Sequence, residues 1–282
     1  MQSSLLPLRV IVKMLELINK NGVSYLRSTV LKSKHAFSTR IGGVSTLEHT
    51  KSLNLAFGRG DDEKTVLSNV EIFANAIEID GNSIISVPQI HSNDVRIVTF
   101  ADAGAGVSRR ADFECDGYVT SEVGLPLGVK TADCVPILLE ARDELGNVAA
   151  VSAVHAGWRG TAARIAEAAV DKLCSLGVGR ENIFVAIGPC IDVCCYEVGK
   201  DFANTIKEKL GQNYENKYIH TDESGRLYAD LKGMNIEILT SAGVPEKNID
   251  VSDYCTCCNP TLFYSHRRQR GVRGAMMSVI CK

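Results

Sequence analysis

The sequence lacks the features that mark several classes of protein. No run of apolar residues approaches the roughly 20 that a helix needs to cross a bilayer. Basic and acidic residues nearly balance, at 31 and 33, so a net charge of −2 gives the chain no general attraction for nucleic acid or an anionic membrane. Repeats and low-complexity tracts are also missing. We therefore expect a cytoplasmic globular protein that binds neither nucleic acid nor membrane.

The N-terminus resembles a secretory signal only superficially. Arg9 and Lys13 interrupt its apolar part, and no small-residue cleavage site follows. Met14 could be the natural start, so residues 1–13 are predicted to be a disordered extension. No linker divides residues 14–282, which we expect to form one catalytic domain, present as a monomer or a weak homodimer.

Apolar periodicity predicts an α/β (α+β) fold. Helices are predicted where apolar residues recur every three or four positions, at 63–77, 161–176, 200–210 and 231–242. Short apolar or alternating runs predict strands at 83–87, 95–100, 125–129, 135–139, 148–154 and 183–187. Because hairpin-like and crossover connections are mixed, we expect a layered sandwich with a mixed β-sheet.

The ten cysteines are too few for a small disulfide scaffold, and without a secretory signal we expect them to be reduced. Six of them form two clusters, Cys190, Cys194 and Cys195, and Cys255, Cys257 and Cys258. The clusters could form a structural zinc site, but we find no clean Cys-x2-Cys spacing in either cluster. We favour buried thiols without a ligand.

Three separated segments each carry one soft metal ligand: QIHSND at 89–94, KTADC at 130–134 and AVHAGWRG at 153–160. The ligands are His91, Cys134 and His155. Two imidazoles and a thiolate bind zinc well and leave a fourth position open, which is typical of a catalytic zinc. Taken alone, each of these residues could instead serve a structural role in a turn or in the core. The prediction of a zinc site therefore depends on all three residues together.

Residues next to His155 and Cys134 could also take part in binding or catalysis. Gly157 and Gly160 follow His155 ahead of a predicted helix, an arrangement that points backbone N–H groups at an anion, and Arg159 adds a forked donor. Asp133 lies between two apolar strands, where a carboxylate needs a partner. It could orient a ligating histidine or act on a substrate proton.

Eight segments, in order along the chain, resemble the YfiH-type family, whose members are called laccase-domain proteins or purine nucleoside phosphorylases. They are FSTRIGGVS (37–45), SLNLAFGRGDD (52–62), QIHSNDV (89–95), KTADCVPILL (130–139), AVHAGWRGT (153–161), AIGPC (186–190), CCYEVG (194–199) and LFYSHRRQRGVRG (262–274). The resemblance implies a sandwich similar to the cysteine-hydrolase-like fold of a bacterial deamidase toxin. It places the metal site of the family at His91, Cys134 and His155.

The resemblance also implies an activity. Family members phosphorolyse adenosine, inosine, guanosine and methylthioadenosine, and they deaminate adenosine. We therefore expect a zinc-dependent purine nucleoside phosphorylase and adenosine deaminase, with copper as an alternative occupant because it binds such ligands more tightly. A multicopper polyphenol oxidase, as the family label suggests, needs several histidine-rich sites, and this chain has six histidines without a paired pattern.

Two other functions stay open. Cys134 could be the nucleophile and His155 the base of a cysteine-hydrolase-type amidase acting on cell-wall precursors. A binding protein with a structural zinc is the third alternative, which three ligands and an open position disfavour.

Nucleosides and phosphate are the expected small-molecule partners, and phosphate requires cationic groups. The candidates for substrate or phosphate binding are Arg40, Asn54, Arg59, Arg159, His266, Arg267 and Arg268, with Asp133 as a further contact to ribose or base. A solvated basic surface is the alternative for the arginines. We expect at least one of Arg40 and Arg267 to line the pocket that contains the metal.

Overall fold

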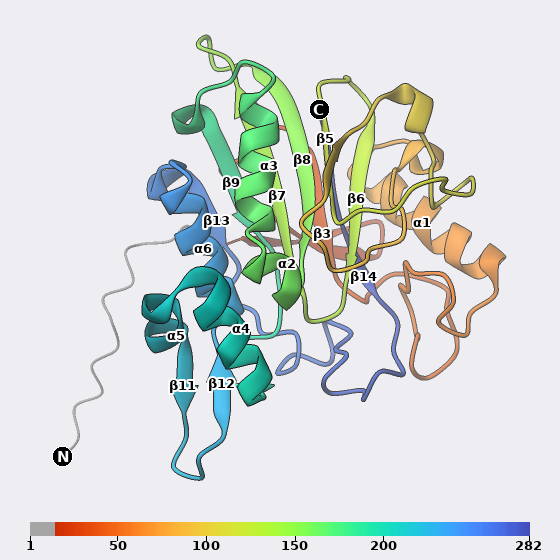
Figure 1. Ribbon diagram of the computed structural model, residues 1–282. Coiled ribbons are helices and arrows are strands. Elements are labelled where there is room, and N and C mark those ends of the chain that lie inside the picture. The colour runs from red at the N-terminus through yellow and green to blue at the C-terminus, as the bar shows by residue number, and fades with distance from the viewer. Residues whose placement is uncertain (1–14) are drawn as a thin grey trace.

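The computed structural model describes residues 15–282 (Figure 1). The predicted extension at 1–13 lies outside the described residues. Across 15–282, no helix combines the length and the apolar character that a bilayer-spanning segment needs.

The largest sheet is six-stranded and mixed. Its order is β13 (Ile249–Val251), β9 (Ile183–Ile187), β7 (Val135–Arg142), β8 (Val148–Ala156), β5 (Gly117–Thr120) and β4 (Val95–Ile97). The outer pairs β13–β9 and β4–β5 are parallel, and the inner pairs are antiparallel. The predicted mixed sheet is therefore confirmed, with the β7–β8 hairpin at its centre.

A second sheet of five antiparallel strands packs against the first. Its order is β1 (Glu16–Lys20), β2 (Val23–Arg27), β3 (Lys34–Ser38), β14 (Met276–Cys281) and β6 (Pro126–Thr131). One buried cluster joins Leu127 and Ile280 of this sheet to Leu138 and Val151 of the other, so the core between the sheets is apolar. A small third sheet has the order β10 (Glu197–Val198), β12 (Leu227–Ala229) and β11 (Ile219–Thr221).

Helices cover both outer faces of this sandwich (Figure 1). Helix α1 (Glu63–Ile77) lies on the five-stranded sheet, and α2 (Trp158–Ala162), α3 (Ile165–Cys174) and α6 (Leu231–Ser241) lie on the side of the six-stranded sheet. Helices α4 (Lys200–Leu210) and α5 (Gln212–Tyr218) lie beside the small sheet, where α4 contacts α2 and α5 contacts α6. Helix α1 buries Val70 and Phe73 in one cluster with Val279 of the five-stranded sheet. On the other side, α3 buries Ala169 in one cluster with Val154 of β8. The layer order is helix, sheet, sheet, helix, as apolar faces on each element require.

The structure corrects several predicted elements. The helix predicted at 161–176 is two helices, because Arg164 adopts a left-handed φ of 60° that interrupts the helical backbone between α2 and α3. The strand predicted at 83–87 is only a single bridge from Ile85 to Leu127 that follows a 3₁₀ turn, Gly81–Ser83. Helix α5 was not predicted, since its polar sequence has no apolar stripe.

Candidate functional site

His91, Cys134 and His155 converge in the folded chain. Cys134 directly precedes β7, and the register of the β7–β8 hairpin pairs Pro136 with His155, so these two ligands lie side by side. His91 comes from the turn before β4. One ligand atom from each residue lies within 4.8 Å of the others, with 4.0 Å between Sγ of Cys134 and Nε2 of His91. A tetrahedral zinc ion would hold such a nitrogen and sulfur roughly 3.5 Å apart, so a small closure of the ligands suffices.

Gly157 is necessary for this close approach. A Cβ atom at that position would lie 2.6 Å from Cδ2 of His91 and 3.5 Å from Sγ of Cys134. Any larger residue would therefore push the His91 ring out of the site. The donor set, two imidazoles and a thiolate beside a residue without a side chain, fits a transition-metal ion such as zinc.

Asp116 organises two of the three ligands, and the sequence analysis missed it. Its fully buried carboxylate accepts a hydrogen bond of 2.8 Å from Nδ1 of His155. The same carboxylate accepts backbone N–H groups of Ile90, His91 and Ser92, at 3.2, 3.0 and 2.6 Å, and the Ser92 hydroxyl at 2.8 Å. The bond from Nδ1 leaves Nε2 of His155 free for a metal. The sequence did offer a signal for this role, because Asp116 is an acidic residue placed directly between Cys115 and the buried strand β5.

The charges of these groups are strongly coupled. Burial disfavours the Asp116 carboxylate, but hydrogen bonds from His155 and Ser92 outweigh it and lower its pKa to about 2. Burial also opposes the Cys134 thiolate, yet the neighbouring His155 and His91 lower its pKa to about 6. Burial opposes a charged His155 in turn, and Cys134 and Asp116 overcome it and raise its pKa to about 9. The site thus favours a thiolate, the form that binds metal.

The three ligands face a cleft with two lobes, of about 440 Å³ and 220 Å³. His91 and Cys134 line both lobes, so the group of three candidate ligands lies at the junction of the lobes. Trp158 and Tyr196 give the larger lobe an aromatic wall, and both contact Phe202, at ring-centroid distances of 5.4 and 5.8 Å. Two larger clefts lie elsewhere but contain no such ligand group. Small-molecule sites usually have this size and mixed lining.

Arginines make the cleft cationic. Arg59 and Arg273 line both lobes, while Arg159 and Arg267 line the larger lobe. The buried Nε of Arg273 has no hydrogen-bond partner within residues 15–282, and burial together with Arg59 lowers the pKa of Arg273 to about 10. A buried guanidinium donor beside a like charge favours the binding of an anion. Arg273 was not among the predicted site residues, although it belongs to the quoted C-terminal segment.

Asp133 holds the C-terminal loop against the cleft. Its carboxylate accepts the Thr256 hydroxyl at 2.6 Å, the Ser265 hydroxyl at 3.1 Å and the Arg267 backbone N–H at 2.7 Å. It lines the larger lobe, as does the neighbouring His266. The sequence suggested that Asp133 could orient a histidine of the site; the hydrogen bond to Nδ1 of His155 goes to Asp116.

Three predicted substrate-binding residues lie outside both lobes. Arg40 donates to the carbonyls of Pro260 and Lys51, at 3.1 and 3.4 Å. Asn54 is fully buried, and its side-chain amide bonds to the backbone of Ala56, to the carboxylate of Asp61 and to the N–H of Ala275. Arg268 donates to the carbonyl of Cys257. Of Arg40 and Arg267, only Arg267 lines the cleft.

Comparisons with known proteins agree with this architecture. A family model described as multi-copper polyphenol oxidoreductase laccase matches residues 34–282. Similar curated proteins include adenosine deaminase RL5 from an unknown prokaryotic organism, 36% identical over 83% of this chain and 88% of that protein. Purine nucleoside phosphorylase YlmD of Geobacillus stearothermophilus is 36% identical over 86% of this chain and 88% of its own. A purine nucleoside phosphorylase of Deinococcus radiodurans is 36% identical over 92% of this chain and 93% of its own length.

Solved structures show the same fold. The crystal structure of the hypothetical protein YfiH from Bacillus licheniformis matches with a TM-score of 0.85 and 32% identity, covering 94% of this chain and 98% of that one. The crystal structure of YlmD from Geobacillus stearothermophilus matches with a TM-score of 0.85 and 31% identity. The match covers 96% of this chain and 99% of that one. The α/β sandwich predicted from sequence is therefore confirmed.

Proposed function

This chain belongs to the multi-copper polyphenol oxidoreductase laccase family, and we propose that it is a zinc-dependent purine nucleoside phosphorylase that also deaminates adenosine. One observation carries the proposal: His91, Cys134 and His155 converge at the junction of two lobes that Arg59 and Arg273 also line, and within residues 15–282 the buried Nε of Arg273 has no hydrogen-bond partner. Relatives named as phosphorylases and as a deaminase support an enzyme of this kind.

The three ligands leave a fourth coordination position for catalysis. A zinc ion held there would supply Lewis-acid activation of a water molecule or a substrate group. Asp116 would keep Nε2 of His155 directed at the ion, and its bonds to the backbone around His91 would keep that ring in place. Copper is the alternative occupant, because one thiolate and two imidazoles can bind either ion.

The arginines of the cleft would hold the phosphate. Arg59 and Arg273 line both lobes, so an anion between them would lie beside the metal position and next to either lobe. In phosphorolysis a phosphate oxygen forms a bond to C1′ of the ribose as the bond from C1′ to the purine breaks. The purine leaves with the bonding electrons and takes up a proton. Charge-assisted bonds from two guanidinium groups position the dianion for this attack.

The aromatic wall of the larger lobe suits the purine ring. Trp158 and Tyr196 offer flat faces on which a base can stack, and stacking is tolerant of which purine is bound. In deamination, water adds to the ring and ammonia leaves, so phosphate takes no part. One cleft can therefore support both reactions with different demands on its arginines.

The multicopper oxidase mechanism has little support. Within the described residues, two groups of His, Cys, Asp or Glu are arranged to share an ion, and only one of them contains histidine. A multicopper oxidase needs several copper sites rich in histidine. The residues of this chain therefore favour a single-metal cleft over the oxidase mechanism that the family description names.

A cysteine hydrolase is a second candidate. Asp116, His155 and Cys134 form a carboxylate, imidazole and thiolate series, and the neighbouring histidines lower the pKa of Cys134 to about 6. Such a series activates a nucleophile when no metal is bound. Zinc would occupy the thiolate, so protection of Cys134 from alkylation by added zinc distinguishes the two mechanisms.

Adenosine tests the proposal because its two products separate the reactions. We expect adenine release to rise with phosphate concentration and to saturate, while inosine forms at the same rate without phosphate. Both products should disappear when the protein is stripped of metal and return when zinc is added. Failure to form either product would contradict the proposal. Hydrolysis of an amide without zinc, at a rate that falls when Cys134 is alkylated, would favour the cysteine hydrolase.

A further inference from the structure

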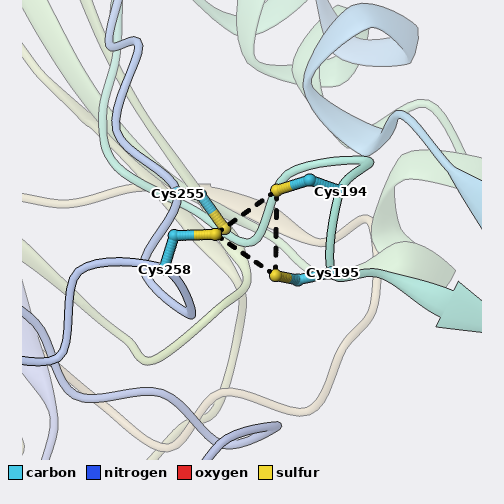
Figure 2. A group of neighbouring side chains, drawn as sticks. All are labelled: Cys194, Cys195, Cys255 and Cys258. Carbon is cyan, nitrogen blue, oxygen red and sulfur yellow. Dashed lines mark hydrogen bonds between the residues drawn. The ribbon is translucent and has the colours of Figure 1, made fainter.

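Four cysteines outside the cleft meet at one point (Figure 2). Cys194 and Cys195 lie in the loop after β9, and Cys255 and Cys258 lie in the loop after β13. Strands β9 and β13 are parallel neighbours, so their loops leave the sheet at the same edge. The sulfur atoms of all four lie within 4.8 Å of one another.

We propose that Cys194, Cys195, Cys255 and Cys258 together bind one structural zinc ion. The sulfur–sulfur distances are 3.7 Å from Cys194 to Cys195, 3.5 Å from Cys194 to Cys258 and 3.4 Å from Cys195 to Cys258. A tetrahedral ion with zinc–sulfur bonds of about 2.3 Å holds its sulfurs roughly 3.8 Å apart. These three distances are close to the spacing that zinc requires, and Sγ of Cys255 lies within 4.8 Å of the other three sulfurs.

The surrounding backbone fits a thiolate site. The N–H of Asp192 points at Sγ of Cys255, at 3.4 Å, and such donors stabilise sulfur ligands. A bridge pairs Cys190 with Cys255, and the N–H of Thr256 donates to the carbonyl of Cys190 at 2.9 Å. The two loops are therefore held together by main-chain bonds, which leaves the sulfurs preorganised.

Cations around the four cysteines offset the charge of a tetrathiolate. Four thiolates and one Zn²⁺ carry a net charge of about −2. Arg267 donates to the carbonyl of Cys195 at 3.0 Å, and Arg268 donates to the carbonyl of Cys257. Lys232 lies nearby, 3.1 Å from the carboxylate of Asp192. Each of these side chains is anchored on one of the two cysteine loops.

Other fates of the thiols fit less well. A disulfide needs sulfurs about 2.05 Å apart and uses only two of them. An iron–sulfur cluster places several atoms between its thiolates, so it needs them farther apart than they are here. Buried thiols, favoured from the sequence, do not describe Cys194 and Cys258, which are exposed. Cys255 and Cys258 do have a Cys-x2-Cys spacing, which the sequence analysis missed because Cys257 lies between them.

The proposed zinc would brace one wall of the cleft. Cys195 is followed directly by Tyr196, which lines the larger lobe. Arg267, another lining residue, is anchored on the carbonyls of Cys195 and Glu197, at 3.0 and 2.7 Å. The site would therefore fix loop positions next to the substrate without contacting it. It is independent of what metal the cleft holds.

The test uses the full chain with Cys134→Ser, which removes a ligand from the cleft site and so separates the two metals. Protein purified without chelators under reducing conditions should retain about one zinc ion per chain with four sulfur neighbours near 2.3 Å by X-ray absorption. Cobalt added to the metal-free protein should give the intense visible absorption of a tetrahedral tetrathiolate. Iron in place of zinc, a disulfide among the four cysteines, or nitrogen or oxygen neighbours around the ion would overturn the proposal.

Variants in the same background identify the ligands. Cys258→Ser should weaken cobalt binding at least about 100-fold and abolish the tetrathiolate spectrum, since one of four ligands is lost. Cys257→Ser is the matched control, because Cys257 lies in the same loop but outside the group of four, and it should keep the spectrum. Unchanged binding in Cys258→Ser would contradict the proposal. If that variant fails to fold, the X-ray absorption measurement on Cys134→Ser alone decides.

Discussion

Nδ1 of His155 donates a hydrogen bond of 2.8 Å to Oδ1 of Asp116, a carboxylate without exposed surface. The same carboxylate accepts the N–H of His91 at 3.0 Å. One buried group therefore orients two proposed metal ligands that come from different parts of the chain. This arrangement is common where a histidine must present one defined nitrogen to a metal.

Replacing this carboxylate should weaken the metal site. Asp116→Asn keeps the size but leaves one acceptor oxygen where five hydrogen bonds now converge. We expect metal affinity to fall roughly 10- to 100-fold and the free energy of unfolding to fall by about 1–3 kcal/mol. Metal titration and denaturant unfolding measure the two effects. Asp94→Asn, an exposed carboxylate nearby, should change neither, and equal effects of both variants would contradict the assignment.

Removing the thiol should abolish activity at little cost in stability. Cys134→Ala deletes a ligand beside an open cleft rather than a packed core side chain, so we expect a stability loss of about 1 kcal/mol or less. Nucleoside turnover and thermal unfolding give the two readouts. Cys174→Ala, a partly exposed thiol on α3, should keep full activity. Wild-type turnover in Cys134→Ala would show that Cys134 is only a packed thiol.

The arginines of the cleft should separate the two reactions. Arg273→Ala is expected to lower phosphorolysis of adenosine roughly 10- to 100-fold, from the loss of a charge-assisted bond to phosphate. Deamination, which needs no phosphate, should fall much less. Arg40→Ala is the control, since Arg40 bonds to backbone carbonyls outside both lobes. Equal loss of both reactions in Arg273→Ala would remove the phosphate assignment.

His35 should make the fold sensitive to acid. Its Nε2 accepts the N–H of Ser28 at 2.9 Å and its Nδ1 donates to the carbonyl of Ser33 at 2.7 Å, so only the neutral ring satisfies both bonds. Burial lowers the pKa of His35 below its usual 6.5. As pH falls below 6.5, the unfolded chain takes up the proton first, and stability falls with a slope of at most about 1.4 kcal/mol per pH unit.

Substitution checks this pH dependence. Between pH 7.5 and 5, His35→Gln should lose less unfolding free energy than the wild type, because glutamine does not titrate. His220→Gln, at an exposed position in β11, should keep the wild-type slope. Denaturant unfolding across that range measures the slopes, and parallel curves for His35→Gln and wild type would exclude the effect.

Strong local patterns were enough to predict part of the fold. The bounds of α1 and α4 match the apolar periodicity of residues 63–77 and 200–210. The break at Arg164 was not predictable, because neither glycine nor proline marks it and its left-handed φ depends on how α2 and α3 pack. Residues 83–87 have the composition of a strand, but tertiary pairing leaves only a bridge at Ile85.

The residues of the candidate site also fall into those that the sequence predicted and those that it did not. Cys134 and His155 follow from strand ends that one hairpin register brings together, which a local pattern can indicate. Asp116 reaches them because β5 pairs with β8, a contact between segments far apart in the sequence. Arg40 and Arg273 carry the same charge in similar glycine-rich segments, and only the packed loops decide that Arg273 faces the cleft.

Phosphate-dependent cleavage of a nucleoside at the three-ligand centre is the central claim, and inosine with phosphate tests it most directly. Chromatography should detect hypoxanthine and ribose 1-phosphate in equal amounts from the zinc-loaded protein. Neither product should form without phosphate or with Cys134→Ala. Free ribose in place of ribose 1-phosphate, or undiminished hypoxanthine from Cys134→Ala, would contradict the account.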